Sequence, residues 1–176
     1  MVQAREHAGT VAERHPRLSL FVRSQLPVAA SLTILRLMMW VFDIPVDRPA
    51  LFAAGAIAVG LLTVAALALP WERWPVRYQA IPASLDIVAL TLVAISRYEQ
   101  IDSVGVLVAL PAIWLAVVAG WAGVAIGVLG CFAASLLPLV LGISSTRPQE
   151  WAATILIAGV LSVAVIVARI LTARYE

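Results

Sequence analysis

The uncharged stretch over residues 103–141 constrains this chain more than any other feature of its sequence. A single helix over that stretch would be about 60 Å long at ~1.5 Å per residue, about twice the thickness of a bilayer's hydrocarbon core. Two crossings therefore fit the stretch better than one. The glycines of the short segment 120–123 predict the place where the chain turns back.

Similar apolar runs fill most of the remaining sequence. The chain has 176 residues, of which 62% are hydrophobic and only 12% charged, too few to give a soluble domain its polar surface. We therefore predict an all-α, polytopic bundle in the plasma membrane over residues 27–176. Its six transmembrane helices are expected at about 28–44, 50–69, 81–97, 103–119, 122–141 and 150–171.

Residues 1–26 form a polar segment of mixed charge that precedes the first apolar run. The absence of an early apolar stretch argues against a signal peptide. Within 16–26, the side chains of Leu18, Phe21, Val22 and Gln25 share one helical face, which favours a short helix lying on the membrane surface. The alternative is a plain cytosolic lead-in to the first crossing.

The orientation of the bundle follows from its arginines, which are its only Lys or Arg residues. Positive residues are enriched on the cytoplasmic side of membrane proteins. Placing the N-terminus inside puts more of the flanking arginines inside than outside, so both termini are predicted to be cytoplasmic. The inside set is Arg5, Arg14, Arg17, Arg23, Arg73, Arg77, Arg169 and Arg174, and the outside set is Arg48, Arg97 and Arg147.

Several functional classes find no support in the sequence. The arginines lie in short clusters beside apolar runs, which is typical of membrane flanks and not of a nucleic-acid groove. The single cysteine, Cys131, allows no intrachain disulfide, and both histidines, His7 and His15, lie in the polar segment. We find no catalytic constellation, phosphate loop or metal-ligand cluster, and we predict neither an enzyme nor a bound cofactor or metal.

Two ionisable residues, Arg36 and Asp86, fall inside predicted helices. A charge within a membrane helix is costly and is expected to face the bundle and find a partner. Both residues are expected at similar depths, so a salt bridge is one interpretation and Arg36 reaching to the membrane surface is another. Such a pair could serve as a ligand, proton or switch site, or could only fix the helix register. Asp86 also shares a helical face with Ala89, Val93 and Arg97, which predicts a polar line towards the outer surface.

Small residues recur along the fifth predicted helix, at Gly123, Gly127, Gly130 and Ala134. Gly123 and Gly127 form a GxxxG pattern, which lets helix backbones approach closely. Packing within the chain is the favoured interpretation, and a homodimer interface is the alternative.

Prolines interrupt two of the predicted helices, at Pro111 and Pro138. Each removes a backbone hydrogen bond and can kink its helix. Trp114 lies one turn after Pro111, so these residues could line a small cavity. Ordinary irregularity of the bundle is the other interpretation.

The stretch from Asp86 to Gly130 resembles the N-terminal membrane region of some actinobacterial sensor histidine kinases and diguanylate cyclases. The resemblance lies in Asp86, a short polar loop, the motif Leu110-Pro111-Ala112-Ile113-Trp114-Leu115-Ala116 and the following Gly120. It implies that the last helix, which ends near Arg169 to Arg174, continues into a cytoplasmic signalling domain, in cis or in trans.

The resulting expectation is a membrane sensory module that passes a signal through its last helix. Membrane lipids are its expected surroundings, and no nucleic acid is expected to bind. Two alternatives remain at this point. One is a small-molecule binding or transport subunit that resembles the substrate-capture proteins of energy-coupling-factor transporters, and the other is a scaffold of a cell-envelope complex.

Overall fold

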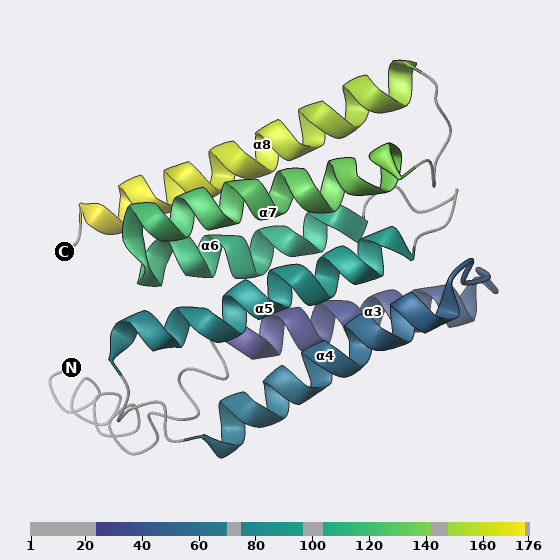
Figure 1. The fold of residues 1–176 in the computed structure, drawn as a ribbon, viewed down its shortest axis with the longest axis horizontal. Helices are drawn as coiled ribbons and strands as arrows, with labels where there is room; N and C mark the ends of the chain where they lie inside the picture. The colour runs from purple at the N-terminus through teal and green to yellow at the C-terminus, as the bar shows by residue number, and fades with distance from the viewer. Residues whose placement is uncertain (1–23, 70–74, 97–103, 142–147, 175–176) are drawn as a thin grey trace, which may run out of the picture.

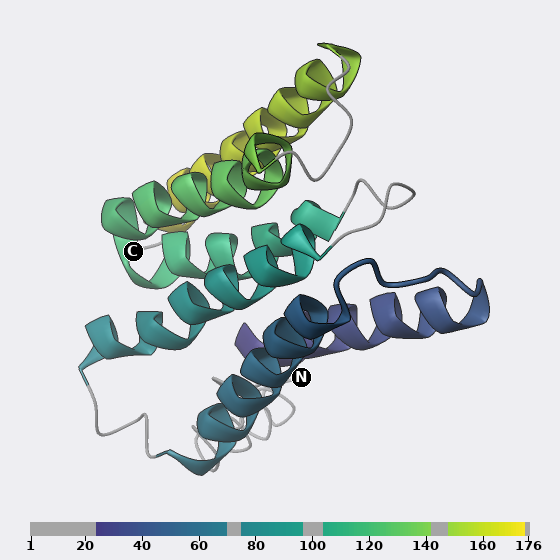
Figure 2. The ribbon, with the colours of Figure 1, turned by 45° about the vertical axis from the view of Figure 1, so that its right-hand side comes forward.

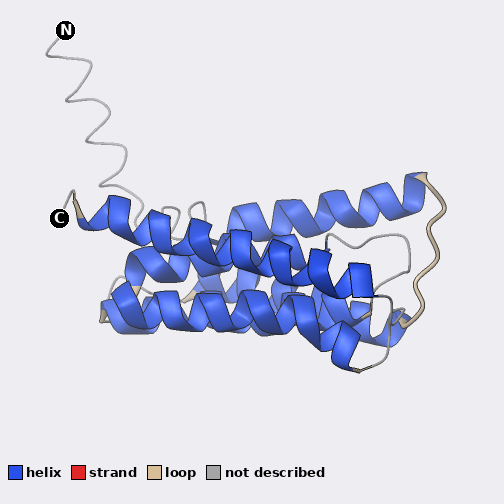
Figure 3. Cartoon of the chain, turned by 90° about the horizontal axis from the view of Figure 1, so that it is seen from above, coloured by secondary structure: helices blue, strands red, loops and turns tan. Residues whose placement is uncertain are grey.

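The computed structural model describes residues 24–69, 75–96, 104–141 and 148–174. Every regular element among them is a helix (Figures 1 and 3). In chain order these are α3 (Leu26–Val41), α4 (Pro49–Ala68), α5 (Val76–Ile95), the short 3₁₀ helix η3 (Val104–Val108), α6 (Ala109–Val118), α7 (Gly120–Val140) and α8 (Pro148–Ala173).

Four of these helices are long and apolar enough to cross a membrane: α4, α7 and most of α5 and α8. Two shorter apolar helices, Leu26–Val41 and Gly105–Val118, accompany them. Large apolar side chains such as Leu61, Leu129 and Leu156 point outward, where water would be a poor solvent for them. The predicted all-helical membrane bundle is therefore confirmed at this level.

The first described helix, α3, ends at Val41, three residues before its predicted end. The reason lies in Asp43, whose φ of 50° places it in the left-handed region. Aspartate tolerates that conformation better than most residues do. The Ile44 amide then donates to the Met39 carbonyl, so the chain turns away before Pro45 could stop the helix.

Two other helices differ from their predicted bounds. The helix α5 starts at Val76 instead of residue 81, because its first turn is too polar for a hydropathy pattern to include. The predicted helix 103–119 is divided: residues 104–108 form η3, and the α-helix begins only at Ala109.

The turn between α6 and α7 is tighter than predicted, since α7 already begins at Gly120 with a φ of 63°. Glycine adopts this conformation without strain. A Cβ on Gly123 would overlap the backbone carbonyl oxygen of Leu115. The first turn of α7 therefore lies directly against the last turn of α6.

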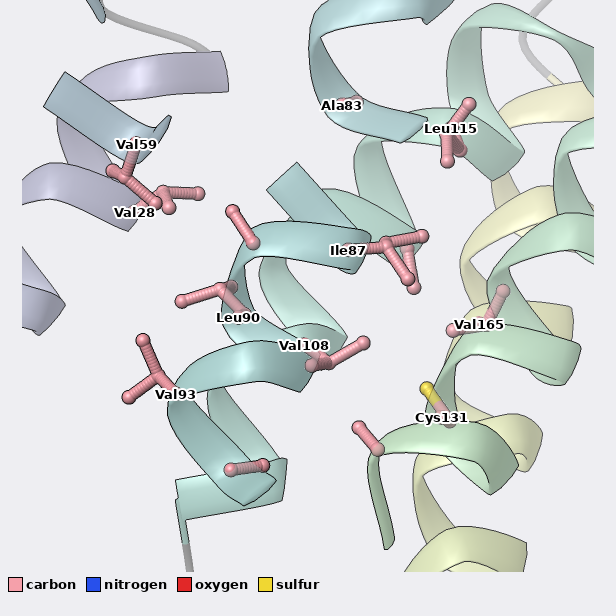
Figure 4. Packing of buried hydrophobic residues seen from close by; sticks show 14 of the residues in the cluster. Val28, Val59, Ala83, Ile87, Leu90, Val93, Val108, Leu115, Cys131 and Val165 are labelled. Carbon is pink, nitrogen blue, oxygen red and sulfur yellow. The ribbon is translucent and has the colours of Figure 1, made fainter. Parts of the chain in front are cut away.

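The helices form a bundle with α5 and α6 at its centre (Figure 1). The helices α7 and α8 pack together on one side, and α3 and α4 lie on the other. Buried side chains of all these helices form one core, to which α5, α6 and α7 contribute most (Figure 4). It includes Leu90, Leu115, Cys131 and Val165, together with Val28 of α3 and Val59 of α4.

The helix α3 is the least integrated of the long helices. It crosses α4 at an angle and diverges from it (Figure 2), and it touches α4, α6 and η3 at only a few positions. Apolar packing therefore contributes less to the docking of α3 than to that of any other long helix.

Candidate functional site: a polar cluster in the bundle

The carboxyl group of Asp86 lies at the middle of the bundle. Asp86 is ten residues after Val76, the first residue of α5, which places it about 15 Å along the helix at ~1.5 Å per residue. Its side chain is fully buried, with a relative exposure of 0%. It faces the point where α3 begins.

Gln25 provides the partner of this carboxyl. Its Nε2 donates a hydrogen bond of 2.5 Å to Oδ2 of Asp86, and Gln25 itself is fully buried. Gln25 occupies the N-cap position of α3, but its side chain makes no capping bond to the helix. Pro27 lies in the first turn, where its missing N–H leaves one fewer donor to cap. The amide is thereby available to α5.

A third helix contributes Thr63 of α4. The Thr63 hydroxyl lies 3.4 Å from Oε1 of Gln25 and 2.8 Å from the Val59 carbonyl oxygen of its own helix. A hydroxyl carries one proton, so the shorter bond to Val59 dominates and the contact with Gln25 is weak. We name Gln25, Thr63 and Asp86 the polar cluster; it joins α3, α4 and α5.

The polar cluster is incompletely satisfied. Oδ1 of Asp86 has no hydrogen-bond partner in the described part of the chain. The Gln25 amide is neutral, and no cation among the described residues forms a salt bridge with Asp86. Burying a carboxyl with a single neutral donor is costly. Oδ1 of Asp86 could therefore accept a hydrogen bond from a further donor, and an arrangement of α3 that exposes the carboxyl would compete with the docked one.

Arg36 is not part of this cluster. Gln25 lies at the level of Asp86, and Arg36 follows eleven residues later, about 16 Å further along α3 at ~1.5 Å per residue. An arginine side chain does not span that distance. Arg36 is exposed, with its guanidinium 5.9 Å from the centre of the Phe52 ring. The hypothesis of an Arg36–Asp86 pair is therefore wrong, because α3 begins near mid-bundle and not at its edge.

The predicted polar line along α5 is also absent over its described part. Ala89 and Val93 are buried, and they lie so close to Gly55 of α4 that a Cβ there would come within 2.6 Å of both residues. The face that starts at Asp86 is thus covered by α4. Arg97 lies outside the described residues.

The small residues of α7 lie at helix contacts within the chain. A Cβ on Gly127 would come within 3.0 Å of Ala112 in α6, and one on Gly130 within 2.5 Å of Ile87 in α5. Ala134, which is also buried, faces Gly105 of η3. Together with Gly123, these residues are covered by α5, η3 and α6 and offer no surface to a second copy.

The prolines and Trp114 stay in the interior of the bundle. Pro111 and Pro138 are buried, and Trp114 is half-buried against the core. The Trp114 indole N–H is buried without a hydrogen-bond partner among the described residues. A groove of about 860 Å³ lies elsewhere, between α3 and α4, and none of these three residues lines it.

Sequence reasoning missed Gln25 and Thr63. Gln25 was grouped with the face of a surface helix over 16–26; residues 16–23 lie outside the described residues, but Ser24 and Gln25 are buried. The available signal was a polar amide directly before an apolar run. Within the part of the chain that the structure describes, no three His, Cys, Asp or Glu residues come together as metal ligands would. Comparisons with family models, curated proteins and solved structures gave no match for this chain.

Proposed function

We propose that this chain is a multi-pass input module of the plasma membrane, with both ends in the cytoplasm, that couples a signal in the membrane or outside it to a cytoplasmic output through α8. The observation that carries this proposal is the hydrogen bond between Gln25 and Asp86. It attaches α3, which packs sparsely on its neighbours, to the centre of the bundle through a buried polar contact.

A helix attached in this way can exchange between a docked and a released arrangement. Because α3 has few contacts with the other helices, loss of the buried hydrogen bond between Gln25 and Asp86 would weaken its docking. A ligand or a membrane change that favours one arrangement of α3 then shifts the population between docked and released forms.

The helix α6 supports a route from α3 to the output. It contacts α3 on one side and packs against α8 on the other. It also carries much of the buried core, including Ala112 and Leu115. A displacement of α3 would therefore act on the same rigid helix against which α8 rests.

The position of α8 suits an output helix. It lies at the edge of the bundle and packs mainly on α6 and α7 (Figure 1). Near its C-terminal end, the guanidinium of Arg169 lies beside Gly120, at the turn between α6 and α7. Movement of that turn would be transmitted to the last turns of α8, which lead out of the bundle.

Hydrogen–deuterium exchange of the chain in nanodiscs tests this route. Gln25→Leu should speed exchange in α3 and also in the last turns of α8. The matched control is Thr91→Val, which removes a hydroxyl that bonds only to the Ile87 carbonyl of its own helix and does not line the groove between α3 and α4. Faster exchange confined to α3 would refute the coupling.

A small-molecule binding subunit is the second candidate, favoured by the groove between α3 and α4. Mass spectrometry of the purified protein distinguishes the two. A stoichiometric copurified metabolite would support the binding subunit. Stoichiometric envelope proteins without a signalling partner would support the scaffold instead.

A further inference from the structure

The groove between α3 and α4 has an unusual lining for a site between apolar helices. Its volume of about 860 Å³ lies within the range of small-molecule sites, roughly 300–1,000 Å³. Apolar side chains such as Leu32, Ala53 and Ile57 form most of its wall. Arg36 is the one charged side chain among the described residues that line it.

The placement of Arg36 makes one end of the groove polar, the end nearest to Val41. Arg36 lies five residues before the end of α3 at Val41, so its Cα is about 8 Å from that end at ~1.5 Å per residue. An arginine side chain can extend towards the headgroup level over such a distance. Trp40, which is 73% exposed, lines the same end of the groove, and tryptophan favours that level of a bilayer.

None of the described residues that line the groove is acidic, so the lining does not neutralise Arg36. The guanidinium carbon lies 5.9 Å from the centre of the Phe52 ring, and Arg36 makes no ion pair with another described residue. The nearby Asp43 and Asp47 belong to the connection between α3 and α4, and neither lines the groove.

From this combination we infer that the groove between α3 and α4 binds an anionic phospholipid, with its phosphate on Arg36 and an acyl chain along the apolar wall. Phosphate oxygens accept the forked N–H donors of arginine in a bidentate manner. The apolar wall continues from Arg36 along α4 to Ala56 and Ile57, as an acyl chain requires. This inference does not depend on the proposed signalling role.

Native mass spectrometry of the detergent-solubilised chain tests the lipid site. The probes are dioleoyl phosphatidylglycerol, dioleoyl phosphatidylcholine and free glycerol phosphate. We expect one phosphatidylglycerol to be retained, with an affinity about tenfold weaker for Arg36→Gln, the range for loss of a charge-assisted hydrogen bond. The matched control is Arg48→Gln, an exposed arginine beside the groove that does not line it.

A second pair of variants tests the apolar wall with the charge retained. Ala53 lines the groove and Ala54 does not, and both are exposed on α4, so a large side chain is tolerated at either position. Ala53→Trp should displace the lipid, and Ala54→Trp should leave it bound. Equal retention of the two phospholipids, equal binding by the wild type and Arg36→Gln, or binding of glycerol phosphate alone would overturn the inference. A lipid-free dimer that Ala53→Trp disrupts would assign the groove to a second copy and would overturn it too.

Discussion

The hydrogen bond between Gln25 and Asp86 permits a quantitative test by a double-mutant cycle. The perturbations are Gln25→Leu, Asp86→Leu and the combination of both. Each single change leaves the other polar side chain buried without its main partner, since Thr63 gives Gln25 only a weak contact. The double change replaces both partners by apolar side chains of similar size.

The expected magnitudes follow from burial and geometry. Interhelical hydrogen bonds in membranes average about 0.6 kcal/mol in such cycles and reach about 1.7. Both partners are fully buried and the acceptor is a carboxyl group, so we expect a coupling energy of about 1.5 kcal/mol, near the top of that range. Gln25→Leu should destabilise more than Asp86→Leu, because it leaves the carboxyl without any bond. The double variant should be more stable than Gln25→Leu.

Reversible unfolding in mixed micelles with increasing dodecyl sulfate, followed by tryptophan fluorescence, provides the four free energies. Thr91→Val, whose hydroxyl bonds only within its own helix, should change the stability by less than about 0.5 kcal/mol. Additive effects of the two single changes, within about 0.5 kcal/mol, would show that the contact contributes nothing specific. The argument that α3 is attached by this bond would then fail.

Three further predictions concern packing and topology. Gly123→Ala should lower the free energy of unfolding by about 3 kcal/mol or more, because its Cβ would overlap the Leu115 carbonyl oxygen. The control Gly60→Ala, whose Cβ would have no atom within 4 Å, should leave the stability unchanged or raise it by up to about 1 kcal/mol. Equal stabilities of the two variants in the same titration would refute the close approach of α6 and α7. Cys131 is fully buried, so a maleimide should label it only after unfolding, and rapid labelling of the folded protein would contradict the core. A reporter enzyme that functions only in the cytoplasm should be active when fused after residue 176, and one that functions only in the periplasm should be inactive there. Activity of the periplasmic reporter would reverse the proposed orientation.

The helices could be predicted from sequence because their apolar runs are long and their breaks contain proline, glycine or charge. The division of the uncharged stretch 103–141 is the best example, since bilayer thickness requires a turn within it and the glycines at 120 and 123 indicate where. The 3₁₀ start of that stretch, η3, could not be predicted. Hydropathy does not distinguish a 3₁₀ turn from an α-helical one, and both fill the same apolar space.

The partner of Asp86 could not be predicted, for a geometric reason. Equal depths for Arg36 and Asp86 follow only if each helix starts at the membrane surface. In the structure α5 starts at Val76, earlier than predicted, and α3 starts near mid-bundle. The earlier start of α5 moves Asp86 towards the level of Arg36, but the offset of α3 moves Arg36 further away, so the two residues end at different depths. A hydropathy pattern carries no information on the offset between two helices.

The same offset explains why Gln25 is buried in the bundle while Arg36, on the same helix, is exposed in a groove. Because α3 begins beside Asp86, its N-cap residue Gln25 places a neutral amide against a buried acid, where a full positive charge would need a complete set of partners. Because α3 then diverges from α4, its later turns leave a groove, and Arg36 occupies the end of that groove nearest to Val41. A molecule bound in the groove would press on the same helix that Gln25 attaches to the core. Occupancy at Arg36 and docking at Gln25 are therefore expected to be energetically coupled through the rigid length of α3, with the coupling equal in both directions.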